Sequence, residues 1–166
     1  MRDEGGQALE IDARRLELGA LRLAARGACF GEVAGWERTN WFAPEGKKAE
    51  YEYTYGRQNW FEYSAAEHRA TREGVTMFDQ SSFGKFMLEG PDAERIINQV
   101  SANDMSVANG KIVYTQWLNE RGGIEADLTV LRVASDKYLV VTAAATQVRD
   151  YMWLKDHIGE NDRAVL

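Results

Sequence analysis

Two segments in the second half of the chain show the hydrophobic pattern of a β-hairpin. Residues 111–118 and 124–133 are rich in β-branched and aromatic residues, and they flank the polar sequence Asn-Glu-Arg-Gly-Gly at 119–123. Adjacent glycines permit positive φ angles, which favours a tight turn between the two strands. A third strand is predicted at 138–142, and a strand-like run at 85–89 ends at a Gly-Pro pair.

Helical spacing of apolar residues predicts two helices in the first half of the chain. The first covers residues 12–26 and ends before Gly27, where a C-terminal glycine is expected. The second begins at a capping box formed by Ser64 and Glu67 and runs to Glu73.

Two further helices are predicted in the second half. Asp92 is the expected N-cap of a helix over 93–100, whose apolar residues fall on one face. The last helix covers 146–158. Its predicted buried face consists of Val148, Tyr151 and Met152. An antiparallel meander mixed with helices predicts an α+β fold rather than a doubly wound parallel sheet.

Aromatic residues are concentrated between Trp36 and Tyr63. Nine of the eighteen Trp, Tyr and Phe residues fall in these 28 positions. Tyr51, Tyr53 and Tyr55 alternate as on one face of a strand. The simplest interpretation is that the rings of this segment fill a core or an interface, as buried aromatic residues generally do.

Composition narrows the classes of function. The chain has 166 residues, 45% of them hydrophobic, and a formal charge of −6. It has no Lys/Arg block of the kind that tracks nucleic-acid phosphates, and no apolar run of the roughly 20 residues that a membrane span needs. One cysteine and two histidines exclude an internal disulfide and leave almost no ligands for zinc. We therefore expect a cytoplasmic protein, or one of the mitochondrial matrix in a eukaryote, without nucleic-acid, membrane or metal partners.

Two acidic residues are candidates for chemistry. Asp104 follows Asn103 in a loop between a helix and a strand, where a carboxylate can steer a proton or hold a cationic nitrogen. From the residues alone, an Asx turn is the favoured interpretation of this pair. Asp127 lies in an otherwise apolar strand, and an acid in that setting is more often solvated on the outer face of a sheet.

An ordered series of motifs between Gly27 and Ile158 resembles the folate-binding domain of the glycine cleavage T-protein, the aminomethyltransferase family. The series is more specific than any single motif in it. In chain order, the motifs are Gly35–Arg38, Glu67–Ala70 with Arg72, Phe78–Ser82, Gly90–Ala93, Asn103–Asp104, Tyr114, Leu118–Ile124 and Tyr138–Thr142. Within that family, the segments 35–42 and 55–61 resemble the C-terminal half of FAD-dependent dimethylglycine and sarcosine dehydrogenases.

The resemblance implies a cofactor and three site residues. In these dehydrogenases a separate flavin domain, absent from this chain, oxidises an N-methyl amine, and the folate domain captures the one-carbon unit on tetrahydrofolate. The family's catalytic aspartate maps onto Asp104, which would orient and polarise the folate nitrogen. The family's turn asparagine maps onto Asn119, whose amide could bind the pterin edge. Tyr114 matches a tyrosine beside the pocket, and a core tyrosine is the alternative at this position. With the resemblance included, the functional interpretation of Asp104 becomes the favoured one.

The resemblance also implies that the chain is incomplete as a catalyst. We expect residues 1–26 to be a helical junction segment and 27–166 to be the N-terminal part of the folate-binding domain. The missing C-terminal half-domain would leave apolar surface exposed, so self-association is expected without it. Two alternatives remain: a non-catalytic folate-binding or regulatory module, and a stand-alone glycine cleavage aminomethyltransferase.

Overall fold

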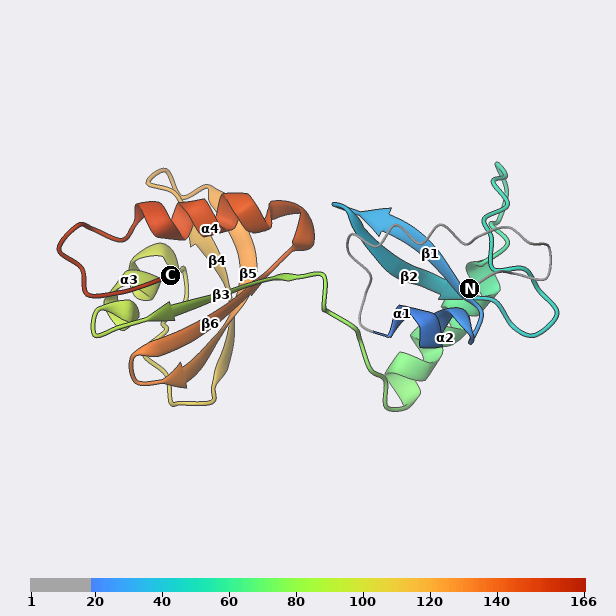
Figure 1. The fold of residues 1–166 in the computed structure, drawn as a ribbon, viewed down its shortest axis with the longest axis horizontal. Helices are drawn as coiled ribbons and strands as arrows, with labels where there is room; N and C mark the ends of the chain where they lie inside the picture. The colour runs from blue at the N-terminus through green and yellow to red at the C-terminus, as the bar shows by residue number, and fades with distance from the viewer. Residues whose placement is uncertain (1–18) are drawn as a thin grey trace. The chain divides into compact units, whose positions relative to one another are not determined.

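The computed structural model describes residues 19–166, and the chain forms two compact units (Figure 1). Unit 1 ends at Ser82 and unit 2 begins at Phe83. Within residues 19–166, no helix has the length and apolar character needed to cross a membrane. Because most of the predicted junction segment 1–26 precedes the described residues, its assignment stays a prediction.

Unit 2 contains the predicted antiparallel sheet. Its four strands are β3 (Gly84–Glu89), β4 (Ile112–Leu118), β5 (Ile124–Ala134) and β6 (Lys137–Thr142), in the order β3-β6-β5-β4. All neighbouring pairs are antiparallel. The turn between β4 and β5 is closed by the Asn119 N–H, which donates to the Gly123 carbonyl at 2.9 Å, and Gly122 has the expected positive φ of 76°.

One face of this sheet carries the core of unit 2. Helices α3 (Ala93–Val100) and α4 (Gln147–Asp156) both pack into that core, as Figure 1 shows for their positions beside the sheet. Alternating strand residues reach it from β3, β4, β5 and β6, as a half-covered sheet requires. The buried residues are Leu88, Ala93, Ile96, Ile97, Val100, Met105, Trp117, Ala126, Leu128, Val130, Tyr138, Val140 and Leu154.

The predicted buried face of the last helix is wrong in part. Val148 and Met152 are 71% and 43% exposed, whereas Asp150 and Leu154 are the buried residues of α4. The Asp150 carboxylate accepts hydrogen bonds from the hydroxyls of Thr142 at 2.5 Å and Thr146 at 2.7 Å. These bonds allow a charged side chain to lie inside, which apolar spacing alone cannot anticipate.

The C-terminal segment lies against β3. Glu89 and Val165 exchange backbone hydrogen bonds at 2.9 and 2.8 Å. Gly90 has a φ of 137°, a region that favours glycine, and a side chain at this position would overlap the backbone carbonyl of Arg163. Asp92 precedes α3 as predicted, but its carboxylate accepts the Arg163 backbone N–H at 2.8 Å and makes no cap hydrogen bond to the helix.

Unit 1 has a hairpin that the sequence pattern did not predict. Its elements are α1 (Ala20–Ala24), β1 (Ala28–Val33), β2 (Trp36–Phe42) and α2 (Phe61–Glu73), with β1 and β2 antiparallel. Residues 12–18 of the first predicted helix lie outside the described residues. The interior is small: Cys29, Trp41 and Ala43 are buried, and the rings of Tyr51, Trp60 and Tyr63 pack around them. Burial raises the pKa of the Cys29 thiol.

Two local predictions in unit 1 are wrong. Ser64 does not start a helix: α2 begins three residues earlier, at Phe61, after Trp60 has packed into the aromatic interior. The alternating tyrosines form no strand, since residues 51–54 have no regular structure. Tyr53 and Tyr55 are exposed, whereas Tyr51 contacts Trp41 edge-on at 6.4 Å. Ring packing, rather than sheet pairing, therefore organises this segment.

Candidate functional site

Asp104 lies on a segment that follows α3 and runs along the edge of β4. The Ala102 N–H donates to the Gln116 carbonyl at 2.8 Å, and the Asn103 side-chain amide donates to the Tyr114 carbonyl at 2.7 Å. These bonds place the Asn-Asp motif beside the middle of β4, where Asn103 contacts the backbone of Tyr114. Two of the three predicted site residues are thereby brought to one edge of the sheet.

The local and the functional interpretations of Asp104 are compatible. Its Oδ1 accepts the Ser106 backbone N–H at 2.8 Å, which is the Asx turn favoured from the residues alone. The side chain is exposed, and Oδ2 has no hydrogen-bond partner in the described part of the chain. One carboxylate oxygen holds the loop, so the other is available to a ligand.

A polar network under this loop was missed by sequence reasoning. The Tyr138 hydroxyl donates to Glu94 Oε2 at 3.2 Å, and Glu94 forms an ion pair with Arg132 at 2.5 Å. Burial, followed by the negative charge of Glu94, raises the pKa of Tyr138 to about 12. The three residues come from β6, α3 and β5, and no local signal in the sequence links them.

The raised pKa of Tyr138 predicts a loss of stability in alkali. Unfolded tyrosine has a pKa of about 10, so between pH 10 and 12 the folded state keeps a proton that the unfolded state loses. This contribution to stability is fully present below pH 10 and falls as the pH rises toward 12. Urea unfolding at several alkaline pH values should show a shallower decline for Tyr138→Phe than for the parent. Parallel declines would contradict the assignment.

Tyr114 lies on the face of the sheet opposite the core. Its ring is 61% exposed, and its hydroxyl is hydrogen-bonded to Asp127, which raises the pKa of Tyr114. Asp127 is itself exposed and accepts the Gln116 side-chain amide at 3.4 Å. The expectation that Asp127 is solvated on the outer face agrees with this position, and Tyr114 is not a core residue.

Asn119 closes the turn between β4 and β5. Its Oδ1 accepts the backbone N–H groups of Arg121 at 3.0 Å and Gly123 at 2.9 Å, and its Nδ2 donates to Glu125 Oε1 at 2.7 Å. The side-chain oxygen is therefore fully used by the turn. One Nδ2 hydrogen remains for a ligand.

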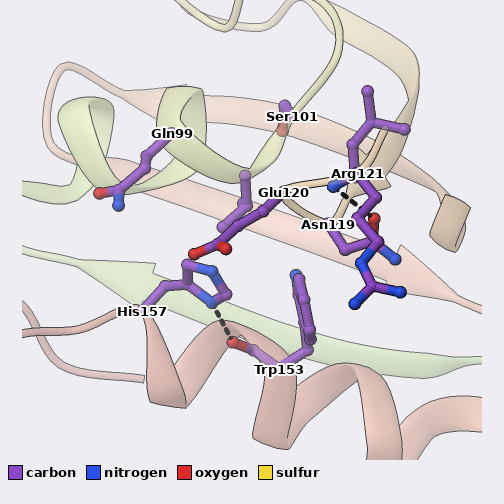
Figure 2. Close-up of a pocket in the computed structure, with 9 residues that line it drawn as sticks. Gln99, Ser101, Asn119, Glu120, Arg121, Trp153 and His157 are labelled. Atoms are coloured by element: carbon purple, nitrogen blue, oxygen red, sulfur yellow. Dashed lines mark hydrogen bonds between the residues drawn. The ribbon is translucent and has the colours of Figure 1, made fainter. Parts of the chain in front are cut away.

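Asn119 also lines a groove of about 750 Å³ at the same end of β4 (Figure 2). The rings of Trp153 and His157 form one wall, 4.8 Å apart, and the His157 Nδ1 contacts the Trp153 carbonyl at 2.7 Å. Asp104 and Tyr114 are not among the lining residues. These are Gln99, Val100, Ser101, Leu118, Asn119, Glu120, Arg121, Trp153 and His157. The predicted site residues thus occupy two places along β4.

Residues 20–165 match the model of the family described as the GCVT N-terminal domain. The chain belongs to the GCVT N-terminal domain family. The resemblance predicted from the ordered motifs is confirmed.

The GCVT N-terminal domain fold is also found in the crystal structure of glycine cleavage system aminomethyltransferase T from Bartonella henselae. The match covers 92% of this chain and 37% of the chain in that structure, with a TM-score of 0.72 and 23% sequence identity. The predicted α+β fold is confirmed by this similarity.

Several curated proteins are similar to this chain in sequence. A 4-methylaminobutanoate oxidase (formaldehyde-forming) of Paenarthrobacter nicotinovorans is 49% identical over 144 residues, which are 87% of this chain and 17% of that protein. The pyruvate dehydrogenase phosphatase regulatory subunit of Mus musculus, a mitochondrial protein, is 31% identical over 87% of this chain and 17% of its own length. Mitochondrial dimethylglycine dehydrogenase of Mus musculus is 30% identical over 76% of this chain and 14% of its own length. The chain therefore spans less than a fifth of these relatives.

Proposed function

We propose that this chain is the tetrahydrofolate-binding part of an enzyme that demethylates an N-methyl amine carrying a carboxylate. The observation that carries the demethylation is the 49% identity with a 4-methylaminobutanoate oxidase (formaldehyde-forming), and membership of the GCVT N-terminal domain family supports the folate-binding part. In this proposal a flavin outside this chain oxidises the amine, and the folate bound here takes up the one-carbon unit. Cytoplasmic location, or the mitochondrial matrix in a eukaryote, is part of the same proposal.

The side chains along β4 offer groups that a reduced folate can bind. Asp104 offers a carboxylate oxygen without a protein partner, and a carboxylate of this kind can hold an amine nitrogen and take its proton. The exposed ring of Tyr114, on the outer face of β4, would offer a flat surface to the folate. Asn119 has one amide hydrogen for a pterin acceptor. Tetrahydrofolate would supply the nitrogen that takes up the one-carbon unit.

The roles follow from what each group can do. Asp104 Oδ2 orients the nitrogen and stabilises the positive charge that develops as it attacks, which is an electrostatic role rather than a covalent one. Tyr114 and Asn119 would contribute to folate binding from two places along β4. The proposal therefore expects Asp104 to affect turnover and the other two residues to affect folate affinity.

The substitution Asp104→Asn, made in the intact protein, tests this function. Asparagine keeps the Oδ1 acceptor of the Asx turn, so the loop is retained and only the charge is lost. We expect the formation of 5,10-methylenetetrahydrofolate to fall at least about tenfold, the low end for acid–base catalysis. Asp156→Asn removes the same charge from an exposed position at the end of α4 and serves as the control. An unchanged yield in Asp104→Asn would refute the role of Asp104.

A second candidate function is a regulatory module without catalysis. The similarity to a pyruvate dehydrogenase phosphatase regulatory subunit favours it, because that relative covers as much of this chain as the oxidase does. This function predicts a protein partner and no turnover. Demethylation of 4-methylaminobutanoate or dimethylglycine by the intact protein would exclude it.

A further inference from the structure

The three residues that follow Asp104 are each held by a polar side chain from another element. The Met105 N–H donates to Asn98 Oδ1 at 2.8 Å, and the Ser106 hydroxyl donates to Glu94 Oε1 at 3.1 Å. The Val107 carbonyl accepts from the Arg132 guanidinium at 2.8 Å. A surface loop ordinarily has few such anchors, so this density of bonds marks a segment whose position is fixed.

Glu94 and Arg132 are the centre of these contacts. Glu94 uses one oxygen for Ser106 and the other for Arg132 and Tyr138. The Arg132 side chain is only 14% exposed, and its guanidinium also donates to the Ser135 carbonyl at 3.0 Å. A planar guanidinium with several fixed acceptors has little freedom, so it holds the carboxylate of Glu94 in one place.

Ser106 transmits this placement to Asp104. Its backbone N–H binds Asp104 Oδ1 at 2.8 Å, while its hydroxyl binds Glu94. Fixing Ser106 therefore fixes one oxygen of Asp104 and, with it, the direction of the free oxygen. In the part of the chain that the structure describes, Asp104 forms no hydrogen bond or ion pair with Glu94 or Arg132, so their influence on it passes through the loop.

We propose that Glu94, held by Arg132 and acting through Ser106, is a positioning residue that aims the free oxygen of Asp104 at the folate nitrogen. The proposal rests on the proposed function. A small misplacement of a reacting group is costly to turnover, whereas substrate binding by other groups is largely unaffected. The positioning role therefore predicts a fall in kcat with little change in KM.

Ser106→Ala is the variant that removes the link between Glu94 and the loop. Ser106 is exposed, and alanine keeps the N–H that binds Asp104. It removes the hydroxyl, which donates to Glu94 and accepts from the Asn98 side-chain amide at 3.2 Å. We expect kcat for 5,10-methylenetetrahydrofolate formation to fall about fivefold with KM for tetrahydrofolate unchanged. Ser135→Ala, an exposed serine that contacts Arg132 only through its backbone, is the matched control and should retain full activity.

Glu94 is tested by a pair of substitutions. Glu94→Ala should lower kcat about tenfold, and Glu94→Gln, which keeps an oxygen for the Ser106 hydroxyl, should restore most of it. Circular dichroism and the unfolding midpoint establish that each variant is folded. If Glu94→Ala does not fold, Glu94→Gln and Ser106→Ala carry the test alone. Full activity of both Ser106→Ala and Glu94→Ala would overturn the proposal.

The double variants separate positioning from general support of the fold. If Glu94 and Ser106 act through Asp104, then adding Glu94→Ala or Ser106→Ala to Asp104→Asn should cause no further loss of kcat. Multiplication of the single losses would overturn the positioning role while leaving the function of Asp104 intact. Full activity of Asp104→Asn alone would instead refute the proposed function, so the two failures are distinguishable.

Discussion

Replacing Trp117 with alanine is expected to lower the free energy of unfolding of unit 2 by about 3–5 kcal/mol. Trp117 is fully buried on β4, and its partner across the strand pair is the small residue Ala126. The neighbouring side chains of the core therefore cannot fill the space that a lost indole leaves. Urea unfolding followed by circular dichroism measures the change as a lower midpoint at an unchanged slope.

Trp117→Phe is the matched control. The buried indole Nε1 of Trp117 has no hydrogen-bond partner among residues 19–166. Phenylalanine therefore removes an unsatisfied donor and keeps most of the ring. We expect a cost of about 1–2 kcal/mol, well below that of alanine. Equal losses in the two variants would show that the volume of the ring is not what stabilises this core.

Gly90→Ala should be the second strongly destabilising change, with a loss of about 2–4 kcal/mol from backbone strain and steric overlap together. Its φ of 137° disfavours any side chain, and the added Cβ would overlap the carbonyl of Arg163. Relief of that overlap requires the C-terminal segment to move away from β3. Faster hydrogen exchange at the Val165 N–H, which binds Glu89, would be the structural sign.

Gly122→Ala separates the two contributions at Gly90. Gly122 also has a positive φ, 76°, but a Cβ there meets nothing within 4 Å. It should cost only the strain of a left-handed residue, about 1–2 kcal/mol. If both alanine variants unfolded at the same urea concentration, the overlap with Arg163 would contribute nothing to the loss of stability in Gly90→Ala.

Sequence patterns located the sheet of unit 2 because its strands obey local rules. The hairpin 112–134 alternates in hydrophobicity on either side of a Gly-Gly turn, and the helix 93–100 buries four residues at regular spacing. Unit 1 follows different rules. Its first strand, Ala28–Val33, buries two consecutive residues instead of alternating ones. It pairs with β2, whose Trp41 belongs to a small aromatic interior. Such packing depends on contacts between segments, which residue spacing does not encode.

The candidate site divides in the same way. The Asn-Asp pair and the turn asparagine were located in the sequence, and the structure places Asn103 beside Tyr114 and Asn119 in the hairpin turn. Their roles toward folate stay proposals. The contact of Glu94 with Tyr138 joins residues 44 positions apart in the chain. A pattern read along the sequence has no means of finding that contact, and the support of Asp104 was missed for this reason.

The single cysteine lies in the smaller of the two interiors, that of unit 1, and can report chemically on the opening of that unit. Cys29 is the only cysteine of the chain. Among the residues that the structure describes, it is one of three buried residues in the unit 1 cluster, compared with thirteen in the core of unit 2. A thiol reagent reaches Cys29 when unit 1 opens, and unit 2 contains no thiol to compete. The rate of covalent labelling therefore measures local unfolding of unit 1 alone, and no probe has to be introduced.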